Sequence, residues 1–384
     1  MRIALDAQLA SAQESYRSAG VSNYTRQLCR ALGELATAHH FTAFAHVDGL
    51  AHPGLGVVRS NARLERPLAR IVWEQTALPA YLARGRFDLV HGLVNVLPLA
   101  TPTPGVVTVH DLSFVRAPGR LPPLKQLYQT VLARWSAVRA RAVIAVSQQT
   151  AADVIACFGV APARVHVVYN GVGAEFTPGD PAAAAEFRAN HRLPPRFLLS
   201  VGTLEPRKNL ERLVRAYARW RAQAAPADQD VHLVLAGGKG WGYDAIFAEV
   251  QAAGLTAMVH FPGFVPWAEL ADWYRAALAF VYPSLFEGFG LPVLEAMACG
   301  APVLCSQAPG VQEIAGAAAL TAPPADEEAL MASLRLLIEQ PALRAELRRR
   351  GLAHAARYSW RRCAEETVGV YEGAMGRGSD GARG

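Results

Sequence analysis

The segment Ser284–Glu295, with the sequence SLFEGFGLPVLE, follows a short apolar run and combines glycines, a proline and two carboxylates. Pro292 indicates that a helix begins near it, because the first helical position needs no backbone N–H. A glycine-rich turn before a helix presents backbone amides to an anion, and phosphate suits such a site. We therefore expect a phosphate-binding turn formed by Gly288, Phe289, Gly290 and Leu291.

Two glutamates flank this turn. Glu287 precedes it directly, and Glu295 stands within the expected helix. Two hydrogen-bond acceptors on either side of one phosphate site suit hydroxyl-rich groups such as a sugar and a ribose. The alternative is a helix-capping acid together with a solvated one.

The segment Val201–Asn209, with the sequence VGTLEPRKN, carries a second candidate group. Gly202 and Thr203 end an expected strand, and Arg207 and Lys208 stand just before the next helix. A guanidinium can bind phosphate oxygens with two hydrogen bonds and an ammonium adds a point charge, so the pair suits a diphosphate leaving group. The alternative is an exposed basic pair that opens a helix.

His110 ends the buried run VVTVH, a position from which a side chain can reach a ligand at the carboxyl edge of a sheet. It could contact a sugar hydroxyl or move a proton, although an isolated histidine is more often a structural hydrogen bonder, and His91 ends a strand in the same way. Gly20 follows the first strand and opens a helix, a weaker second place where backbone amides could approach phosphate.

Two other motifs do not fit their context. Residues 237–242, GGKGWG, lack the spacing of a dinucleotide-binding loop. Asp228 and Asp230 form a D-x-D pattern, but they precede a strand and so lie at the wrong edge of the sheet for a metal-bound donor. We therefore expect no metal site.

Short apolar runs alternate along the chain with segments of helical periodicity. This alternation predicts parallel α/β sheets, which would position the candidate residues. Two such series appear. We expect a first Rossmann-like domain at 1–176, a linker at 177–195 and a second Rossmann-like domain at 196–359. A final helix at 360–375 and a disordered tail at 376–384 follow.

Composition predicts a soluble globular protein of a reducing compartment. The chain of 384 residues is 52% hydrophobic and 18% charged, which excludes the profile of disorder. Its 5 cysteines form no CxxC pair, so neither a disulfide framework nor a zinc site is indicated. We recognise no secretion signal and no membrane-spanning run, and expect a cytoplasmic location.

In this order and spacing, the segments Ser284–Glu295, Val201–Asn209, Val106–Asp111 (VVTVHD) and Val168–Val172 (VYNGV) resemble those of the group 1 retaining glycosyltransferases of the GT-B fold. The resemblance covers roughly residues 1–360. It implies two doubly wound domains facing a deep cleft, with the acceptor bound by the first domain and a nucleotide sugar by the second. It also implies that the final helix crosses back to the first domain.

The resemblance assigns roles to the candidate residues. Glu287 would touch the hydroxyls of the donor sugar and Glu295 the ribose, while Arg207 and Lys208 would hold the diphosphate. His110 would face the donor sugar. Gly20 would approach the phosphates. The implied mechanism needs no cofactor, no metal and no protein nucleophile.

Two positions depart from the family pattern. Thr203 stands where many relatives have an arginine, so either Arg207 takes over its work or Lys208 acts alone. Ser22 stands where relatives often have a second glycine, which weakens the expectation of phosphate contacts in the first domain.

The function expected is transfer of a hexose from a GDP- or UDP-type sugar to a saccharide or lipid-linked saccharide in surface polysaccharide assembly, such as that of lipopolysaccharide. Mannose is the first expectation, with rhamnose or glucose as alternatives. A sugar-nucleotide 2-epimerase of the same fold and a non-catalytic nucleotide-sugar-binding protein remain competing hypotheses.

The net charge of +6 is concentrated before residue 176, and residues 116–141 read as a basic amphipathic helix. Such a helix could rest on an anionic membrane and place the enzyme at the inner face of the plasma membrane. The alternative is a helix that covers the sheet and exposes a basic face. We expect no nucleic-acid partner, because aromatic platforms do not accompany the charge.

Overall fold

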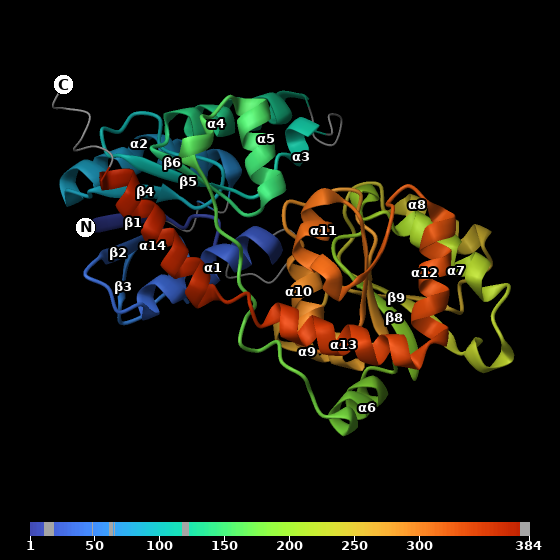
Figure 1. The fold of residues 1–384 in the computed structure, drawn as a ribbon. Coiled ribbons are helices and arrows are strands. Elements are labelled where there is room, and N and C mark those ends of the chain that lie inside the picture. The colour runs from blue at the N-terminus through green and yellow to red at the C-terminus, as the bar shows by residue number, and fades with distance from the viewer. Residues whose placement is uncertain (11–18, 48, 61–63, 65, 117–122, 377–384) are drawn as a thin grey trace. The chain divides into compact units, whose positions relative to one another are not determined.

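A computed structural model of the chain describes residues 1–10, 19–47, 49–60, 64, 66–116 and 123–376. These residues divide into two units, which are described separately (Figure 1). The first unit comprises the residues up to Gly171 together with those from Ser359 onward, and the second unit comprises Val172–Tyr358. The expected tail at 376–384 lies outside the described residues from position 377 onward.

A seven-stranded parallel sheet forms the centre of the first unit, in the order β3-β2-β1-β4-β5-β6-β7. The strands are β1 (Arg2–Asp6), β2 (His40–Ala45), β3 (Leu55–Arg59), β4 (Leu89–Gly92), β5 (Gly105–Val109), β6 (Ala142–Ala145) and β7 (Val165–Val167). The short apolar runs are buried because helices cover a parallel sheet on both faces. The sequence did not predict β3, an edge strand in which only Leu55 is buried and whose apolar signal is therefore weak.

The described residues of the first unit form six helices. They are α1 (Ala19–Glu34), α2 (Pro67–Gly85), α3 (Ser113–Arg116), α4 (Pro123–Arg139), α5 (Gln148–Phe158) and α14 (Trp360–Gly376), and a 3-10 turn, η2, spans Pro162–Arg164. The core cluster joins Phe44, Leu78, Val107 and Val154 from strands and helices. Within the basic stretch 116–141, Arg116 ends α3 and α4 spans Pro123–Arg139, and residues 117–122 lie outside the described residues.

Helix α14 packs against α1 and β6 within the first unit (Figure 1). Its buried side includes Trp360, Thr367 and Tyr371. The Tyr371 hydroxyl lies 2.6 Å from His91 Nδ1 on β4, and His91 Nε2 lies 2.8 Å from the Thr108 hydroxyl on β5. The Thr108 hydroxyl in turn lies 3.0 Å from that of Tyr24 on α1. A chain of four buried polar side chains therefore joins α14 to the sheet and to α1.

The second unit contains a six-stranded parallel sheet in the order β10-β9-β8-β11-β12-β13. The strands are β8 (Arg196–Val201), β9 (Val231–Ala236), β10 (Val259–Gly263), β11 (Ala279–Tyr282), β12 (Val303–Ser306) and β13 (Leu320–Ala322). After β8 the chain builds the sheet outward through β9 and β10, and then crosses back to place β11 on the other side of β8. The gap between the carboxyl ends of β8 and β11 is therefore the topological switch point, where α/β sheets bind their ligands.

Eight helices belong to the second unit. They are α6 (Pro181–Asn190), α7 (Leu210–Arg221), α8 (Asp244–Ala252), α9 (Trp267–Ala276), α10 (Leu291–Ala298), α11 (Pro309–Ala315), α12 (Glu327–Glu339) and α13 (Pro341–Ala355). Three 3-10 turns are η3 (Pro206–Lys208), η4 (Pro226–Asp228) and η5 (Gly316–Ala318). Leu213, Tyr217 and Trp220 recur at helical spacing on the buried face of α7, and they pack in the core with Leu233 and Leu334.

The structure differs from the expected linker at 177–195. Helix α6 occupies the middle of this segment and packs against α9 inside the second unit. The Asp180 side chain accepts a hydrogen bond from the Ala182 amide, and Pro181 opens the helix. Asp180 and Pro181 are a helix-start signal that contradicts a linker without helical structure in this segment.

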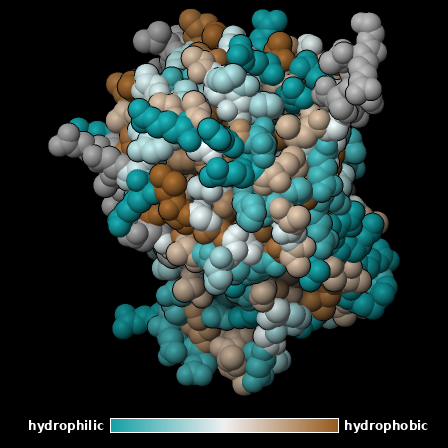
Figure 2. Space-filling view, turned by 90° about the vertical axis from the view of Figure 1, so that its left-hand side faces the viewer, coloured by the Kyte–Doolittle hydropathy of each residue, from teal (hydrophilic) through white to brown (hydrophobic). Residues whose placement is uncertain are grey.

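The surface of the first unit exposes several apolar side chains, among them Leu68 and Val72 on α2 and Leu127 and Val131 on α4. The face drawn in Figure 2 is largely hydrophilic and carries small, separate groups of apolar side chains. Throughout the described ranges, each helix is too short or too polar to cross a membrane.

Candidate active site

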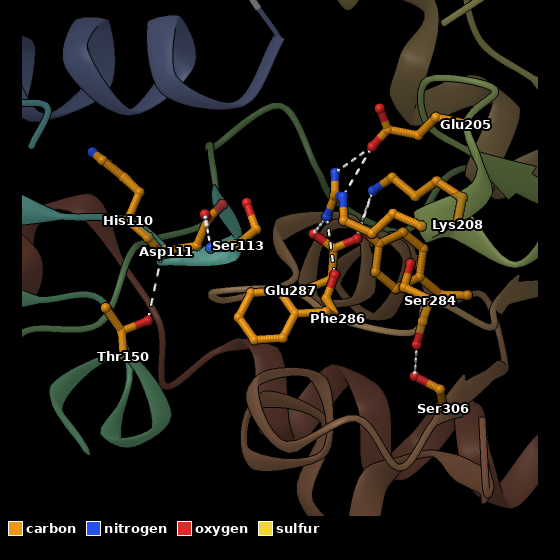
Figure 3. A network of polar contacts seen from close by, with 12 residues as sticks. His110, Asp111, Ser113, Thr150, Glu205, Lys208, Ser284, Phe286, Glu287 and Ser306 are labelled. Atoms are coloured by element: carbon orange, nitrogen blue, oxygen red, sulfur yellow. Dashed lines mark hydrogen bonds and ion pairs between the residues drawn. The ribbon is translucent and has the colours of Figure 1, made fainter. Parts of the chain in front are cut away.

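Arg207, Lys208 and Glu287 meet at the switch point of the second sheet. The two cations end η3, which follows β8, and Glu287 lies in the loop after β11. Lys208 Nζ donates a hydrogen bond to Glu287 Oε1 over 2.7 Å, and the Arg207 guanidinium donates to Glu287 Oε2. Figure 3 shows Lys208 and Glu287 pointing toward one another. The sequence placed these three residues at one site, and the structure brings them into direct contact.

This ion cluster is almost closed to solvent, since Lys208 and Glu287 are each 9% exposed. Burial alone would raise the pKa of Glu287, but Arg207 and Lys208 outweigh it and lower that pKa to about 2. Burial lowers the pKa of Lys208, and the charge of Glu287 opposes this effect. Glu287 is therefore ionised at neutral pH and holds two cations in fixed positions.

Tyr282 and Glu205 complete the cluster, and the sequence analysis identified neither. The Tyr282 hydroxyl accepts a hydrogen bond from Lys208 Nζ over 2.8 Å and donates one to Glu287 Oε1 over 2.9 Å. Glu205 accepts a 2.9 Å hydrogen bond from Arg207 Nε. A tyrosine at the end of a strand carries no sequence signal of this role, because one of its partners, Lys208, follows a neighbouring strand.

Asn209 fixes the loop that carries the two cations. It adopts a left-handed backbone conformation with φ of 58°. Its side-chain amide donates to the carbonyls of Pro283, over 3.1 Å, and Pro324, over 2.8 Å. The Leu285 amide also donates to the Arg207 carbonyl over 2.9 Å. These bonds join the loops after β8 and β11, so the cations and the carboxylate are held as one assembly.

Gly202 lies between β8 and these cations, with a φ of 149° that side chains rarely adopt. A Cβ atom built on Gly202 would lie 3.1 Å from Lys208 Cε. Thr203 follows Gly202 and is half-buried. The glycine therefore leaves room for the lysine side chain, which is a local reason for its position in the sequence.

The turn at 288–291 opens α10 at Leu291, as the sequence predicts. Gly290 precedes the helix with a φ of 102°, and Phe289 is buried. The N-terminus of α10 carries the partial positive charge of a helix start, close to the site after β11. On the other side, Gly310 of α11 lies so close that an added Cβ would come within 2.3 Å of the Glu287 carbonyl.

Glu295 lies on α10 and is 4% exposed. Its Oε2 accepts a hydrogen bond from the Tyr274 hydroxyl over 3.0 Å. Burial raises the pKa of Glu295 to about 8, so the side chain is largely protonated at neutral pH. The structure thus separates the two glutamates of the motif: Glu287 is charged beside cations, and Glu295 is an uncharged buried acid.

In the first unit, His110 follows β5 and donates from Nε2 to the Leu93 carbonyl over 2.9 Å. Its ring meets the Tyr24 ring edge-on, with 4.4 Å between centroids. Burial lowers the pKa of His110, so the imidazole is neutral at physiological pH. Gly20 lies exposed in the first turn of α1, where a Cβ would meet nothing within 4 Å.

The D-x-D pattern serves another purpose. Asp228 and Asp230 both pair with Arg196, over 2.8 and 2.7 Å, near the amino end of β8. In the described part of the chain, no group of three or more histidine, cysteine, aspartate and glutamate side chains is arranged to hold a metal ion.

Comparison with known proteins places this geometry in a family. The family model described as glycosyl transferases group 1 matches residues 183–354, and that described as glycosyltransferase family 4 matches residues 18–176. O-antigen chain mannosyltransferase B of Escherichia coli is 32% identical over 270 residues, which cover 70% of each chain. The chain belongs to the group 1, family 4 glycosyltransferases.

D-inositol 3-phosphate glycosyltransferase 1 of Catenulispora acidiphila is another relative of this glycosyltransferase. It is 35% identical over 341 residues, which cover 81% of this chain and 78% of the relative. Anabaena HepE, solved in complex with UDP-glucose, superposes with a TM-score of 0.74 at 19% identity, covering 97% of this chain and 100% of the other. The glycosyltransferase therefore has two parallel-sheet α/β units of the GT-B type, as expected.

Proposed function

We propose that this glycosyltransferase moves a hexose, with mannose as the first expectation, from a nucleotide diphosphate sugar to a saccharide or lipid-linked saccharide in surface polysaccharide assembly. The observation that carries the proposal is the cluster of Arg207, Lys208 and Glu287 at the switch point of the second sheet. The name of the Escherichia coli relative supports mannose and a polysaccharide product. The UDP-glucose bound to Anabaena HepE supports a GDP- or UDP-type donor.

In this proposal, Lys208 and Arg207 stabilise the negative charge that develops on the departing diphosphate. The amides of residues 288–291 add to this stabilisation, and Gly202 and Thr203 border the same site. Glu287 orients the cations and accepts hydrogen bonds from the donor sugar. Glu295 is assigned to the ribose, and reaching it requires that its buried carboxyl become accessible when the donor binds.

The proposed reaction proceeds with retention on one face of the sugar. The bond between the anomeric carbon and the diphosphate oxygen breaks as the acceptor oxygen forms its bond to the same carbon. The acceptor proton passes to the departing diphosphate oxygen, so neither a protein nucleophile nor a metal ion takes part. His110 and Gly20 are the residues through which the first unit would contact the donor sugar and phosphates.

The test is turnover with radiolabelled GDP- and UDP-sugars and a saccharide acceptor. Replacing Lys208 with Ala should lower kcat/KM by at least about 100-fold, because loss of a transition-state charge contact costs roughly 3 kcal/mol. Lys239→Ala is the matched control, since Lys239 lies in the second unit over the rings of Tyr243 and Phe247. Near-native turnover in the Lys208→Ala variant would refute the assignment.

Product analysis tests the remaining parts of the proposal. The anomeric configuration of the new linkage, determined by NMR, should match that of the donor. A sugar-nucleotide epimerase would instead change the donor in the absence of any acceptor, and a non-catalytic binding protein would leave it unchanged.

We also propose that the first unit contacts an anionic membrane through residues 116–141 at the inner face of the plasma membrane. Support comes from Leu127 and Val131, which are exposed on α4. Arg116, however, pairs with Asp153 of α5, so its charge is partly neutralised. Sedimentation with phosphatidylglycerol vesicles should fall on Leu127→Ser and Val131→Ser substitution, while neutral vesicles should bind neither form.

A further inference from the structure

A pocket of about 320 Å³ opens at the amino edge of the second sheet. Its wall includes residues just before or at the starts of β8, β11 and β12, namely Arg196, Leu278 and Pro302. All strands of this sheet are parallel, so their amino ends share one edge and their carboxyl ends the other. The pocket therefore lies at the opposite edge from Lys208 and Glu287, and nothing in the family comparison assigns it a role.

Five arginines line this pocket: Arg188 of α6, Arg196 of β8, Arg275 of α9, and Arg344 and Arg348 of α13. Among the described residues, no aspartate or glutamate lines it. Two of the five arginines pair with carboxylates that do not themselves line the pocket. Arg196 pairs with Asp228 and Asp230, and Arg275 pairs with Asp272 over 2.8 Å.

The other three guanidiniums have no carboxylate within ion-pair distance in the described chain. Arg188 donates to the Ala276 carbonyl over 3.1 Å, Arg344 to the Leu337 carbonyl over 2.9 Å and the Ile338 carbonyl over 2.5 Å, and Arg348 to the Gly300 carbonyl over 3.4 Å. Burial and the neighbouring charge of Arg196 lower the pKa of Arg344. The charge of Asp228, which pairs with Arg196, opposes this lowering.

Helix capping alone accounts for part of this arrangement. The carbonyls that accept these bonds lie at the ends of α9, α12 and α10, where cations are favourable. Each guanidinium has five N–H groups, however, and capping occupies only one nitrogen of each. Capping also gives no reason for the three arginines to converge on an open cavity whose volume is that of a small-ligand site.

We propose that this pocket binds a phosphate-bearing anion with at least two negative charges, such as pyrophosphate or a phosphomonoester. Arginine forks match phosphate oxygens in geometry and charge, and several forks around one cavity favour a multivalent anion over chloride or a carboxylate. The bound anion would connect α6 and α13 with the edge of the sheet. This proposal is independent of the proposed transfer reaction.

The experiment is calorimetric titration with pyrophosphate of the native protein and of Arg344→Gln and Arg348→Gln variants. The matched control is Arg349→Gln, because Arg349 is the next residue on α13 but has a side chain 72% exposed and paired with Glu346. We expect each pocket substitution to weaken pyrophosphate binding at least tenfold and the control to bind like the native protein. Equal binding by all four proteins would overturn the proposal.

Pyrophosphate could also bind at Lys208, so the location of binding must be measured in the native chain. Hydrogen exchange with and without pyrophosphate should show slower exchange in peptides from α6 and α13. Slower exchange only in peptides around Lys208 and Glu287 would contradict a separate site, whatever the behaviour of the variants.

The phosphate group could belong to a free anion or to a lipid headgroup. Sedimentation with phosphatidylglycerol vesicles, compared between the native protein and the Arg348→Gln variant, separates the two sources. Reduced sedimentation of the variant supports a headgroup, and unchanged sedimentation together with weaker pyrophosphate binding supports a free anion. If neither probe distinguishes the variant from the native protein, the pocket is not a phosphate site.

Discussion

Glu287 accepts hydrogen bonds from three side chains, and this single carboxylate determines how two cations are held in the second unit. Removing it would leave Arg207 and Lys208 close together and largely buried without their shared counter-ion. Breaking a buried ion pair in this way costs more than the pair itself contributes, because the remaining charges lose their compensation. The residue thus serves the stability of the site as well as its proposed chemistry.

The lowered pKa of Glu287 predicts a pH dependence of stability. A carboxylate whose pKa falls from 4.5 to about 2 on folding contributes stability above pH 4.5, and this contribution is lost as the pH falls toward 2. The difference in unfolding free energy between the native protein and Glu287→Gln should therefore be constant from pH 7 to 5.5. It should shrink by about 1 kcal/mol by pH 3.5, as urea titrations would show.

Glu346→Gln is the control for this measurement. Arg349 and Arg350 also lower the pKa of Glu346, but they do so at the solvent-exposed surface, where screening weakens the interaction. The difference in unfolding free energy between Glu346→Gln and the native protein should change little over the same pH range. If the difference in unfolding free energy for Glu287→Gln were equally independent of pH, the buried cluster would not stabilise the ionised form of Glu287.

Gly202→Ala tests whether the backbone, rather than any functional group, positions Lys208. The new Cβ would lie 3.1 Å from Lys208 Cε, and alanine would have to adopt a φ of 149°. We expect a loss of stability of about 1–3 kcal/mol from the strained backbone, with a fall in kcat. Gly369→Ala on α14, where a Cβ meets nothing within 4 Å, should retain both properties.

The sequence identified Arg207, Lys208 and Glu287 because their chemistry and their places after apolar runs are visible without coordinates. It did not identify Tyr282, Glu205 or the structural role of Asn209. The contacts of Lys208 with Tyr282 and of Asn209 with Pro283 depend on β8 lying beside β11, although the two strands are separated along the chain by β9 and β10. The type of a side chain indicates its possible chemistry, whereas the pairing of strands that are distant in sequence determines which side chains it contacts.

At the scale of elements, the buried chain from Tyr371 to Tyr24 ties α14 to the first unit. Burial, with a smaller effect of His110, lowers the pKa of His91 to about 3, so this histidine stays neutral and acts as a hydrogen-bonding link. The edge-on contact of Tyr24 with His110 extends the same assembly to a candidate site residue. The position of His110 therefore depends on a helix far away in the sequence.

Tyr371→Phe should loosen α14. The substitution leaves His91 Nδ1 buried without its partner, which costs about 1–3 kcal/mol in unfolding free energy. Urea unfolding and hydrogen exchange in residues 360–376 would measure the effect. Tyr81→Phe, which removes a hydroxyl from a side chain on α2 that is 44% exposed, should be close to neutral. A Tyr371→Phe protein as stable as native would indicate that water replaces the lost hydroxyl.

The strands that are clearest in the sequence are buried, and the two strands that were not predicted are partly exposed. The buried strands β1, β5, β6, β8 and β11 read clearly from the sequence, since both of their faces are apolar. The edge strand β3 and the short strand β13 are partly exposed, so neither presents a continuous apolar run. Helix α6 has no fully buried residue, which explains why its alanine-rich segment resembled a linker.

At the scale of the whole molecule, the two units are built differently. The second unit is one continuous stretch, Val172–Tyr358, whereas the first needs α14 from the end of the chain. A truncation after Tyr358 should therefore expose the faces of α1 and β6 that α14 covers and unfold the first unit. Hydrogen exchange should show native-like protection in β8–β13 and none in β1–β7. Retained protection in both units would show that α14 is dispensable.

The hydrogen bond between His91 and Tyr371 spans 280 positions of sequence. During synthesis, β4 leaves the ribosome long before its partner helix α14 is made, because the whole second unit lies between them in the sequence. The stretch from Val172 to Tyr358 has all of its own partners by then. We therefore expect the unit whose strands are translated first to complete its folding last, because its surfaces on α1 and β6 stay uncovered until α14 is made.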